Sequence, residues 1–304
     1  MRKPDWLKIS MQGNEHAGAI RRQMRAKGLH TVCEQARCPN LHECWAKHKT
    51  ATFLVLGDVC SRNCRFCSVQ SGRGQAPDEN EPWEVAAAVG ELGLSHVVIT
   101  MVTRDDLHDG GASHLVKIAQ VIRQQAAEDG REVSIELLVS DMQGKDSALE
   151  TLMNAPVEVM SHNLETVSRL SFEIRPQADY ERSLKVLRSM ANAAEKKPDE
   201  SKMYIKSSIM IGLGETRDEI EQSMDDLLEH GVQLLNIGQY LQPTSNQLPV
   251  KKFYHPDEFA SLRETAMAKG FLLVHSGPLV RSSYHAGDDY STIITSTRRF
   301  KARP

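Results

Sequence analysis

The stretch TATFLVLGDVCSRNCRFC, residues 50–67, joins an apolar run to three closely spaced cysteines. Residues 50–57 are rich in β-favouring and aliphatic side chains, and the run is short enough for a buried strand. The cysteines that follow, Cys60, Cys64 and Cys67, form a Cys-x3-Cys-x2-Cys loop. Because α/β proteins place their sites at the carboxyl ends of strands, this stretch predicts a strand that leads into a metal-binding loop.

Five more apolar runs follow, and longer amphipathic stretches separate most of them. The expected strands cover residues 50–57, 96–101, 134–140, 157–163, 203–214 and 234–240, and the expected helices cover 82–93, 112–130, 146–154, 180–196 and 216–231. This alternation predicts parallel strands joined by crossover helices. Six strand–helix units indicate an α/β fold with a partial (β/α)6 barrel, although a doubly wound sheet would show the same alternation.

The two chain ends fall outside this repeat. We therefore predict an N-terminal extension at residues 1–49, a barrel at 50–270 and a C-terminal extension at 271–304. The extensions are expected to cover the open mouth of the barrel.

The overall charge is close to balanced, with 37 Lys and Arg against 40 Asp and Glu and a net charge of -3. Such a balance gives no field that would make nucleic acid or an anionic membrane the expected partner. No stretch approaches the roughly 20 apolar residues of a membrane span, and no apolar segment follows the basic N-terminus. These observations predict a cytoplasmic protein with reduced thiols and no membrane partner.

All six cysteines lie between Cys33 and Cys67, which favours metal binding over a disulfide framework in a chain of this length. Three thiolates around one corner of a cubane [4Fe-4S] cluster leave the fourth iron open to an external molecule. Phe66, between the last two cysteines, is expected to keep water off such a cluster. A zinc site is the alternative, although zinc motifs usually come as two separated pairs of Cys or His.

A second cysteine group, CEQARCPNLHEC, precedes the first. It holds Cys33, Cys38 and Cys44 in a Cys-x4-Cys-x5-Cys arrangement and so supplies three more thiolates. His42 lies inside the group and is either a fourth ligand or a residue beside the site.

Together these motifs carry a resemblance to a known family. The Cys60–Cys67 loop resembles the signature of the radical S-adenosylmethionine superfamily, and the Cys33–Cys44 group resembles the auxiliary-cluster motif of its lipoyl synthase family. The likeness extends over nearly the whole chain, through TRDDLHDGGA (103–112), SHNLETV (161–167), GLGET (212–216), GQYLQPT (238–244), HPDEF (255–259) and GPLVRSSYHA (277–286).

The resemblance implies two [4Fe-4S] clusters and S-adenosylmethionine as cofactors. It implies that the second serine of RSSY, Ser283, is the fourth ligand of the auxiliary cluster; without it, RSSY would be taken for a polar turn. A hydroxyl beside three thiolates is a poor ligand for iron, so this cluster should be easy to dismantle. The resemblance also suggests Asn163, Glu165 and Arg175 as contacts of S-adenosylmethionine.

The activity that the resemblance implies is sulfur insertion at C6 and C8 of a protein-bound octanoyl-lysine, which forms the lipoyl cofactor with the auxiliary cluster as sulfur donor. The implied partners are octanoylated carriers (an E2 lipoyl domain of a 2-oxoacid dehydrogenase or the glycine cleavage H protein), a one-electron reductant such as flavodoxin or ferredoxin, and an iron-sulfur carrier for cluster repair. Ser161, where the family often has Asn, and Thr103, where it usually has Asp or Asn, depart from the pattern.

Two other classes share part of this pattern. A methylthio-transferring enzyme also uses two clusters, but this sequence shows no separate basic RNA-binding domain. A non-enzymatic electron carrier would normally be smaller and would ligate every iron with Cys.

Two glycine-containing segments and a basic tail are weaker signals. Gly212-x-Gly214 lacks the third glycine of a dinucleotide fingerprint and predicts a tight turn, as does Asp109-Gly110-Gly111. The basic tail STRRFKARP, residues 296–304, is expected to be a solvated chain end; the sharper hypothesis is that it steers an acidic carrier towards the site.

Overall fold

The structure is a computed structural model. It describes residues 2–8, 18, 22, 24, 27–35, 40, 51–198, 201–283 and 286.

The centre of the molecule is a curved sheet of eight strands, in the order β1-β2-β5-β6-β7-β8-β9-β10. The strands of this sheet are β1 (His30–Thr31), β2 (Ala51–Val55), β5 (His96–Met101), β6 (Ser134–Leu138), β7 (Val159–Ser161), β8 (Tyr204–Ile211), β9 (Leu234–Gln239) and β10 (Leu273–Gly277). The strands from β2 to β10 are all parallel, and β1 pairs with β2 in the antiparallel sense. Within the described residues, β1 and β10 end the order, so the sheet is an open, partial barrel.

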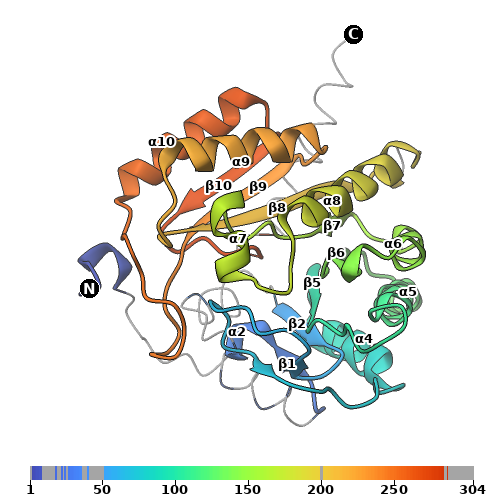
Figure 1. Cartoon of the computed structure of the whole chain (residues 1–304). Helices are drawn as coiled ribbons and strands as arrows, with labels where there is room; N and C mark the ends of the chain where they lie inside the picture. Colours follow the sequence, from blue (N-terminus) through green and yellow to red (C-terminus); the bar gives the residue numbers. More distant parts are fainter. Residues whose placement is uncertain are drawn as a thin grey trace.

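Helices cover the outer face of this sheet (Figure 1). They are α4 (Glu81–Glu91), α5 (Ala112–Glu128), α6 (Asp146–Met153), α7 (Ser168–Ile174), α8 (Tyr180–Glu195), α9 (Arg217–Glu229) and α10 (Pro256–Lys269), with α2 (Val32–Gln35) beside β2 and the short 3-10 helices η1 (Asp5–Leu7) and η2 (Met142–Gly144). Several helices have amino ends that the sequence explains. In α9, for example, Thr216 and Glu219 form a reciprocal capping box.

The two faces of the strands differ, as the two-residue period of a strand requires. On β8, Ile209 and Ile211 pack into the main apolar core towards the helices, whereas Ser208 and Met210 face a cavity inside the barrel. A second apolar cluster is made by the first residues of four neighbouring strands, Val159, Tyr204, Leu234 and Leu273. It fills the amino-terminal end of the barrel, so the cavity opens at the carboxyl end.

The predicted architecture is confirmed, because all six predicted strands and all five predicted helices are present. Helices α7 and α10 and the seventh parallel strand, β10, were not predicted. Strand β10 reads LVHSG, and the apolar run that leads into it, FLLV at 271–274, has the shortest length that indicates a strand. It lies inside the predicted C-terminal extension, and the predicted domain boundaries themselves stay a prediction.

Two glycine turns behave as predicted. Gly212 has φ +107°, and a Cβ there would lie 2.2 Å from Nε2 of Gln239, so this position requires glycine. The turn folds around Glu215, whose carboxylate accepts hydrogen bonds from the backbone N–H groups of Gly212 and Leu213. Asp109 likewise accepts from the N–H groups of Gly111 and Ser113 at the start of α5.

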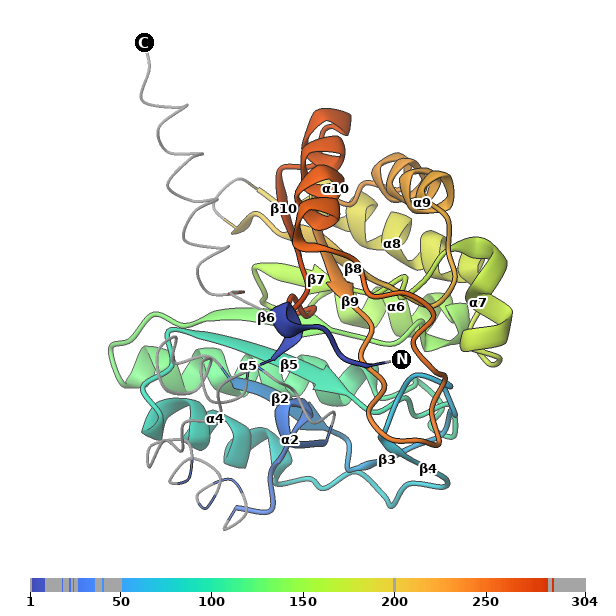
Figure 2. The ribbon, with the colours of Figure 1, turned by 90° about the vertical axis from the view of Figure 1, so that its left-hand side faces the viewer.

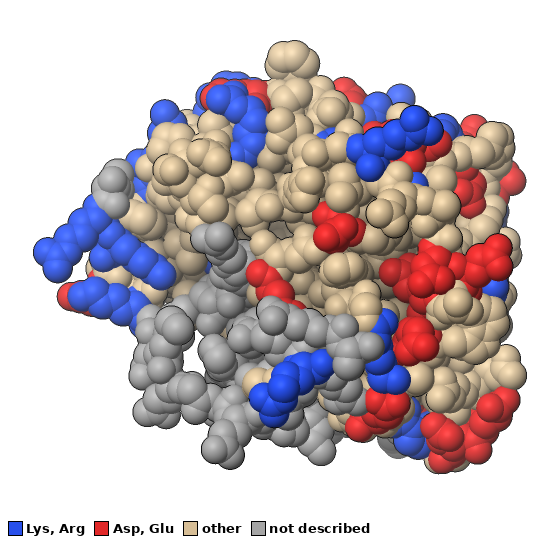
Figure 3. Space-filling model, turned by 90° about the horizontal axis from the view of Figure 1, so that it is seen from below, with Lys and Arg blue, Asp and Glu red and all other residues tan. Residues whose placement is uncertain are grey.

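Among the residues that the structure describes, no helix is both long and apolar enough to cross a membrane. Figure 3 shows that one face of the molecule carries both signs of charge, with Asp and Glu gathered mainly on its right-hand side and Lys and Arg spread over the face.

Candidate active site

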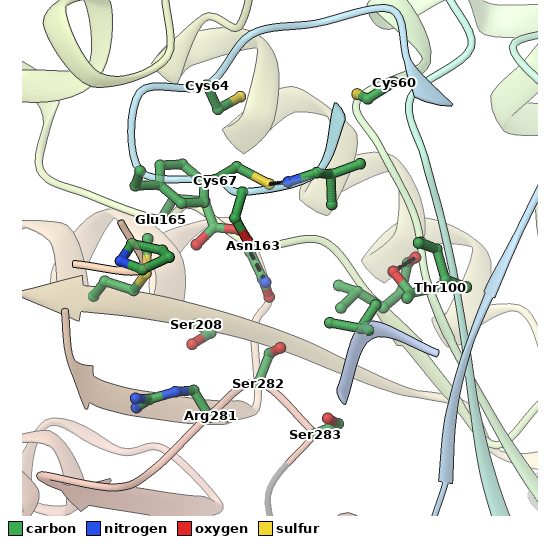
Figure 4. Close-up of a pocket in the computed structure, with 18 of the residues that line it drawn as sticks. Cys60, Cys64, Cys67, Thr100, Asn163, Glu165, Ser208, Arg281, Ser282 and Ser283 are labelled. Carbon is green, nitrogen blue, oxygen red and sulfur yellow. Dashed lines mark hydrogen bonds between the residues drawn. The ribbon is translucent and has the colours of Figure 1, made fainter. Parts of the chain in front are cut away.

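A cavity of about 510 Å³ occupies the carboxyl end of the barrel. Residues from the whole length of the chain line it, including Cys60, Cys64 and Cys67 as well as Cys33 and Ser283. Figure 4 shows the three cysteines on one side, Arg281, Ser282 and Ser283 on the opposite side, and Asn163, Glu165 and Ser208 between them. Cys33 and Ser283, the described members of the predicted auxiliary ligand set, therefore line the same cavity as the three-cysteine loop.

Cys60 is the last residue of β3 (Val59–Cys60), and Cys64 and Cys67 lie on the loop that leads from there to β4 (Gln70–Ser71). A turn brings them together, since the N–H of Cys67 donates to the carbonyl of Cys64 at 3.0 Å. The backbone N–H of Arg62 donates to Sγ of Cys60, and that of Val69 donates to Sγ of Cys67, each at 3.4 Å. Donors of this kind stabilise negative charge on a sulfur ligand.

The protonation chemistry of these thiols fits a bound iron cluster. Burial raises the pKa of Cys64, and it raises the pKa of Cys67 to about 11. Left to themselves these groups would be neutral thiols at neutral pH, whereas coordination to a metal removes the proton outright. None of the four described cysteines forms a disulfide. The residues present thus fit the cluster that the motif predicts.

Arg62 fixes the cysteine loop to the barrel. Its guanidinium donates to both carboxylate oxygens of Asp105, at 2.7 and 2.9 Å, and to Oδ1 of Asp141. Asp141 is completely buried, and its second oxygen accepts from Arg182 at 2.8 Å. Burial alone would raise the pKa of Asp141, but the hydrogen bond and charge of Arg62 outweigh it and hold that pKa well below its usual range. The sequence analysis did not single out this network.

Asn163, Glu165 and Arg175, the predicted contacts of S-adenosylmethionine, all line the cavity. Nδ2 of Asn163 donates to Glu165 at 3.1 Å, and Nη1 of Arg175 donates to the carbonyl of Leu164 at 2.9 Å. Glu165 has φ +68°, in the left-handed region that a Glu rarely adopts. Burial raises its pKa, while the charge of Arg175 and the hydrogen bond from Asn163 oppose that rise. Strain of this kind clusters at functional sites.

His162, in the polar motif SHNLETV at the end of a predicted strand, also lines the cavity, although the motif alone assigns no role to its ring. Its Nδ1 lies 2.9 Å from the carbonyl of Val139 and so must carry the proton. Its Nε2 is buried and has no hydrogen-bond partner among the described residues, as is also true of Nε of Arg175. Burial lowers the pKa of His162 to about 4, so the ring is neutral near pH 7. Two such atoms beside one cavity fit a polar ligand.

Described segments from both the N-terminal and the C-terminal part of the sequence reach this cavity. Cys33 is buried just after β1, and Ser68, next to Cys67, donates its hydroxyl to the carbonyl of Gln35 at 2.8 Å. At the other end, Oγ of Ser283 lies 2.9 Å from Oγ1 of Thr52 on β2. Lys3 lines the cavity too, and Figure 2 shows η1 between the β8–β10 half of the sheet and the half with β1, β2 and β5.

The structure describes only some of the remaining predicted features. Cys38, Cys44, His42 and the basic tail fall outside the described residues. Ser161, one of the two departures from the family pattern, lies below the cavity, where its hydroxyl donates to Glu136 at 2.7 Å. Glu136 also forms a buried ion pair with Lys206 at 3.1 Å. Thr103 lines the cavity, and its carbonyl accepts from the N–H and the hydroxyl of Ser61.

The sequence comparisons agree with this architecture. The family model of the radical SAM superfamily matches residues 54–227. A lipoyl synthase of Shouchella clausii is 51% identical over 303 residues, which covers 100% of this chain and 95% of that protein. A lipoyl synthase of Halalkalibacterium halodurans is 53% identical over 288 residues, 95% of this chain and 92% of that protein.

A comparison of solved structures supports the fold. The crystal structure of Streptococcus suis SuiB bound to S-adenosylmethionine aligns with a TM-score of 0.53 at 14% identity, over 78% of this chain and 53% of SuiB. At this identity the likeness bears on the barrel fold alone. The relatives of about half identity over the full length decide the family, and the chain belongs to the lipoyl synthase family of radical S-adenosylmethionine enzymes.

Proposed function

We propose that this enzyme inserts two sulfur atoms, at C6 and C8, into an octanoyl chain that is amide-linked to a lysine of a carrier protein. Its cofactors are two [4Fe-4S] clusters and S-adenosylmethionine. When bound, they supply a 5'-deoxyadenosyl radical that abstracts hydrogen from the octanoyl chain and the sulfide that replaces that hydrogen.

In this proposal the two ligand sets divide the work. Cys60, Cys64 and Cys67 hold the cluster that binds S-adenosylmethionine. Cys33, with Cys38 and Cys44 from outside the described residues, and Ser283 hold the auxiliary cluster. The observation that supports this division is that Cys33 and Ser283, 250 residues apart in the sequence, line the same cavity as the three-cysteine loop.

The cavity itself orients the cosubstrate. Asn163, Glu165 and Arg175 offer an amide, a carboxylate and a guanidinium for the polar groups of S-adenosylmethionine. The unpartnered Nε2 of His162 offers an acceptor beside them. Apolar residues such as Leu54, Phe66 and Met210 line the remainder and exclude water, which protects a reactive carbon radical from side reactions.

The partners follow from the chemistry. The carrier is the E2 lipoyl domain of a 2-oxoacid dehydrogenase or the glycine cleavage H protein, and the reaction takes place in the cytoplasm. One-electron reduction of the first cluster falls to a flavodoxin or a ferredoxin. Because the auxiliary cluster gives up its sulfide, an iron-sulfur carrier is needed to rebuild it.

Two single substitutions test the division of labour. Under anaerobic conditions, with dithionite and an octanoyl-lysine peptide, Cys64→Ala is expected to abolish formation of 5'-deoxyadenosine and therefore of product. Ser283→Ala is expected to retain formation of 5'-deoxyadenosine and to lose sulfur transfer. Full lipoyl formation by Ser283→Ala would contradict the assignment of Ser283, and both products can be followed by mass spectrometry.

A further inference from the structure

The segment that leads into Ser283 is held against β9, and Ser283 itself contacts β2. Nδ2 of Asn236 on β9 donates to the carbonyls of Arg281 and Ser282, at 2.8 and 2.9 Å. Gly238, two residues further along the same strand, lets the carbonyl of Val280 approach so closely that a Cβ at this position would lie 2.2 Å from that oxygen. Together these contacts fix the backbone of the segment that precedes Ser283.

The hydroxyl of Ser283 has its own contact, with Thr52. The two side-chain oxygens lie 2.9 Å apart, and Thr52 is buried. A serine that ligates iron as an alkoxide carries no proton and can only accept a hydrogen bond. The hydroxyl of Thr52 then donates, and a donor to an ionised oxygen makes a stronger bond than a donor to a neutral one.

Strand β2 also pairs with β1, which leads directly into the segment that contains Cys33. Phe53, next to Thr52, pairs with Thr31 of β1, and Cys33 follows two residues after Thr31. Thr52 therefore lies on the strand that links the Cys33 segment to Ser283. No spacing pattern marks a threonine inside a buried strand, so only the folded chain reveals this contact.

We infer that Thr52 is a positioning residue for the auxiliary cluster: its hydroxyl orients Ser283 as the fourth ligand and fixes it relative to Cys33. The inference rests on the proposed function, because it takes Ser283 as a ligand. Hydrogen-bonding partners of metal ligands typically contribute 10–100-fold to metal affinity.

The test uses the full-length chain, reconstituted with iron-57 and sulfide, in four forms: wild type, Thr52→Val, Thr52→Ser and Thr100→Val. Thr100 is the matched control, since it lines the same cavity from β5 but donates its hydroxyl to the carbonyl of Leu138 at 3.0 Å. Mössbauer spectra detect the oxygen-ligated iron, and a chelator measures the rate of iron loss from the auxiliary cluster in a background that also carries Cys60→Ala, Cys64→Ala and Cys67→Ala.

Thr52→Val is expected to lose the signal of the oxygen-ligated iron and to release iron roughly tenfold faster. Thr52→Ser, which keeps a hydroxyl, and Thr100→Val are expected to match the wild type in both readouts. An unchanged spectrum and an unchanged rate in Thr52→Val would overturn the inference. If Thr52→Val does not fold, Thr52→Ala removes the same hydroxyl without added volume and is judged by the same two outcomes.

Ser283→Ala separates the failure of the inference from failure of the proposed function. If Ser283→Ala changes the spectrum and Thr52→Val does not, the role of Thr52 is wrong and the ligand set stands. If Ser283→Ala leaves the spectrum unchanged, Ser283 is not a ligand. The proposed ligand set of the auxiliary cluster and the role of Thr52 are then both wrong.

Discussion

At the scale of single residues, the side chains of the cavity differ in how well the sequence predicts them. Cys60, Cys64 and Cys67 are marked by their spacing, and Ser283 is marked only through the family resemblance. Thr52 was not predicted, because a Thr in an apolar strand is more often a satisfied core residue. His162 lies in the polar motif SHNLETV at the end of a predicted strand, which indicates a site but no role for the ring. What gives these residues a role is tertiary contact, which no local pattern encodes.

The buried ring of His162 predicts a pH dependence of stability. Its folded pKa of about 4 lies below the ordinary value of 6.5, so the unfolded chain takes up the proton first as the pH falls. The stability that the neutral ring contributes is complete above pH 6.5 and is lost on acidification towards pH 4. Between pH 7.5 and 5.5 the loss amounts to about 1 kcal/mol.

His162→Gln should therefore lose about 1 kcal/mol less stability than the wild type between these two pH values, as measured by urea unfolding. Gln keeps a donor for the carbonyl of Val139. The control is His108→Gln, at an exposed histidine, which should lose as much stability as the wild type does. Identical pH dependence in His162→Gln and wild type would show that the ring is not held neutral.

We expect loss of the Glu165 carboxylate to weaken the binding of S-adenosylmethionine. Removing its carboxylate with Glu165→Ala should raise KM for S-adenosylmethionine about tenfold, the effect of one hydrogen bond to a charged group. The control is Glu173→Ala, on the exposed end of α7, which should leave KM unchanged. The measurement is the rate of 5'-deoxyadenosine formation against cosubstrate concentration; equal KM values for the two variants would refute the assignment.

At the scale of elements, the sequence predicted strands and helices well where the pattern was long and periodic. Strand β10 and helix α7 are short, so the sequence pattern does not reveal them, and what they contact is known only from the folded structure. Helix α7 supports the cysteine loop: the carbonyl of Ile174 at its end accepts from the N–H of Arg65 at 2.9 Å. The cysteine loop is thus held by a backbone hydrogen bond to α7 and by the ion pairs of Arg62 with Asp105 and Asp141.

Arg62 and Arg65, three residues apart on this loop, should respond differently to the same substitution. Arg62 is buried between Asp105 and Asp141, so Arg62→Met leaves two carboxylates short of a partner and should cost about 3 kcal/mol of the free energy of unfolding. Arg65 is half exposed and pairs loosely with Glu173 at 3.9 Å, so Arg65→Met should cost less than about 1 kcal/mol.

Urea unfolding measures both variants, and the iron content after reconstitution shows whether the loop still forms. We expect Arg62→Met to retain less iron than Arg65→Met. Equal stability of the two variants would contradict a structural role for the Arg62 network.

At the scale of the whole molecule, the central feature is that described segments on both sides of the predicted barrel sequence, with Cys33 and Ser283, line one cavity. Cys33 and Ser283 line the cavity together with Cys60, Cys64 and Cys67, and Figure 4 shows Ser283 across the cavity from these three cysteines. The alternating pattern predicted the barrel, but it could not place the ends, because they lie outside the repeat and depend on long-range contacts such as that between Thr52 and Ser283.

From this arrangement we expect the inserted sulfur atoms to come from the auxiliary cluster. In the proposed arrangement, the auxiliary cluster that Ser283 would ligate shares the cavity with the site of radical formation and would donate its own sulfide to the octanoyl chain. The most direct measurement is a single turnover of the enzyme, reconstituted with sulfur-34 sulfide and freed of unbound sulfide, on an octanoyl-lysine peptide. We predict a peptide with two heavy sulfur atoms, formed through an intermediate with one. A peptide that gains light sulfur, or none while 5'-deoxyadenosine accumulates, would contradict the account.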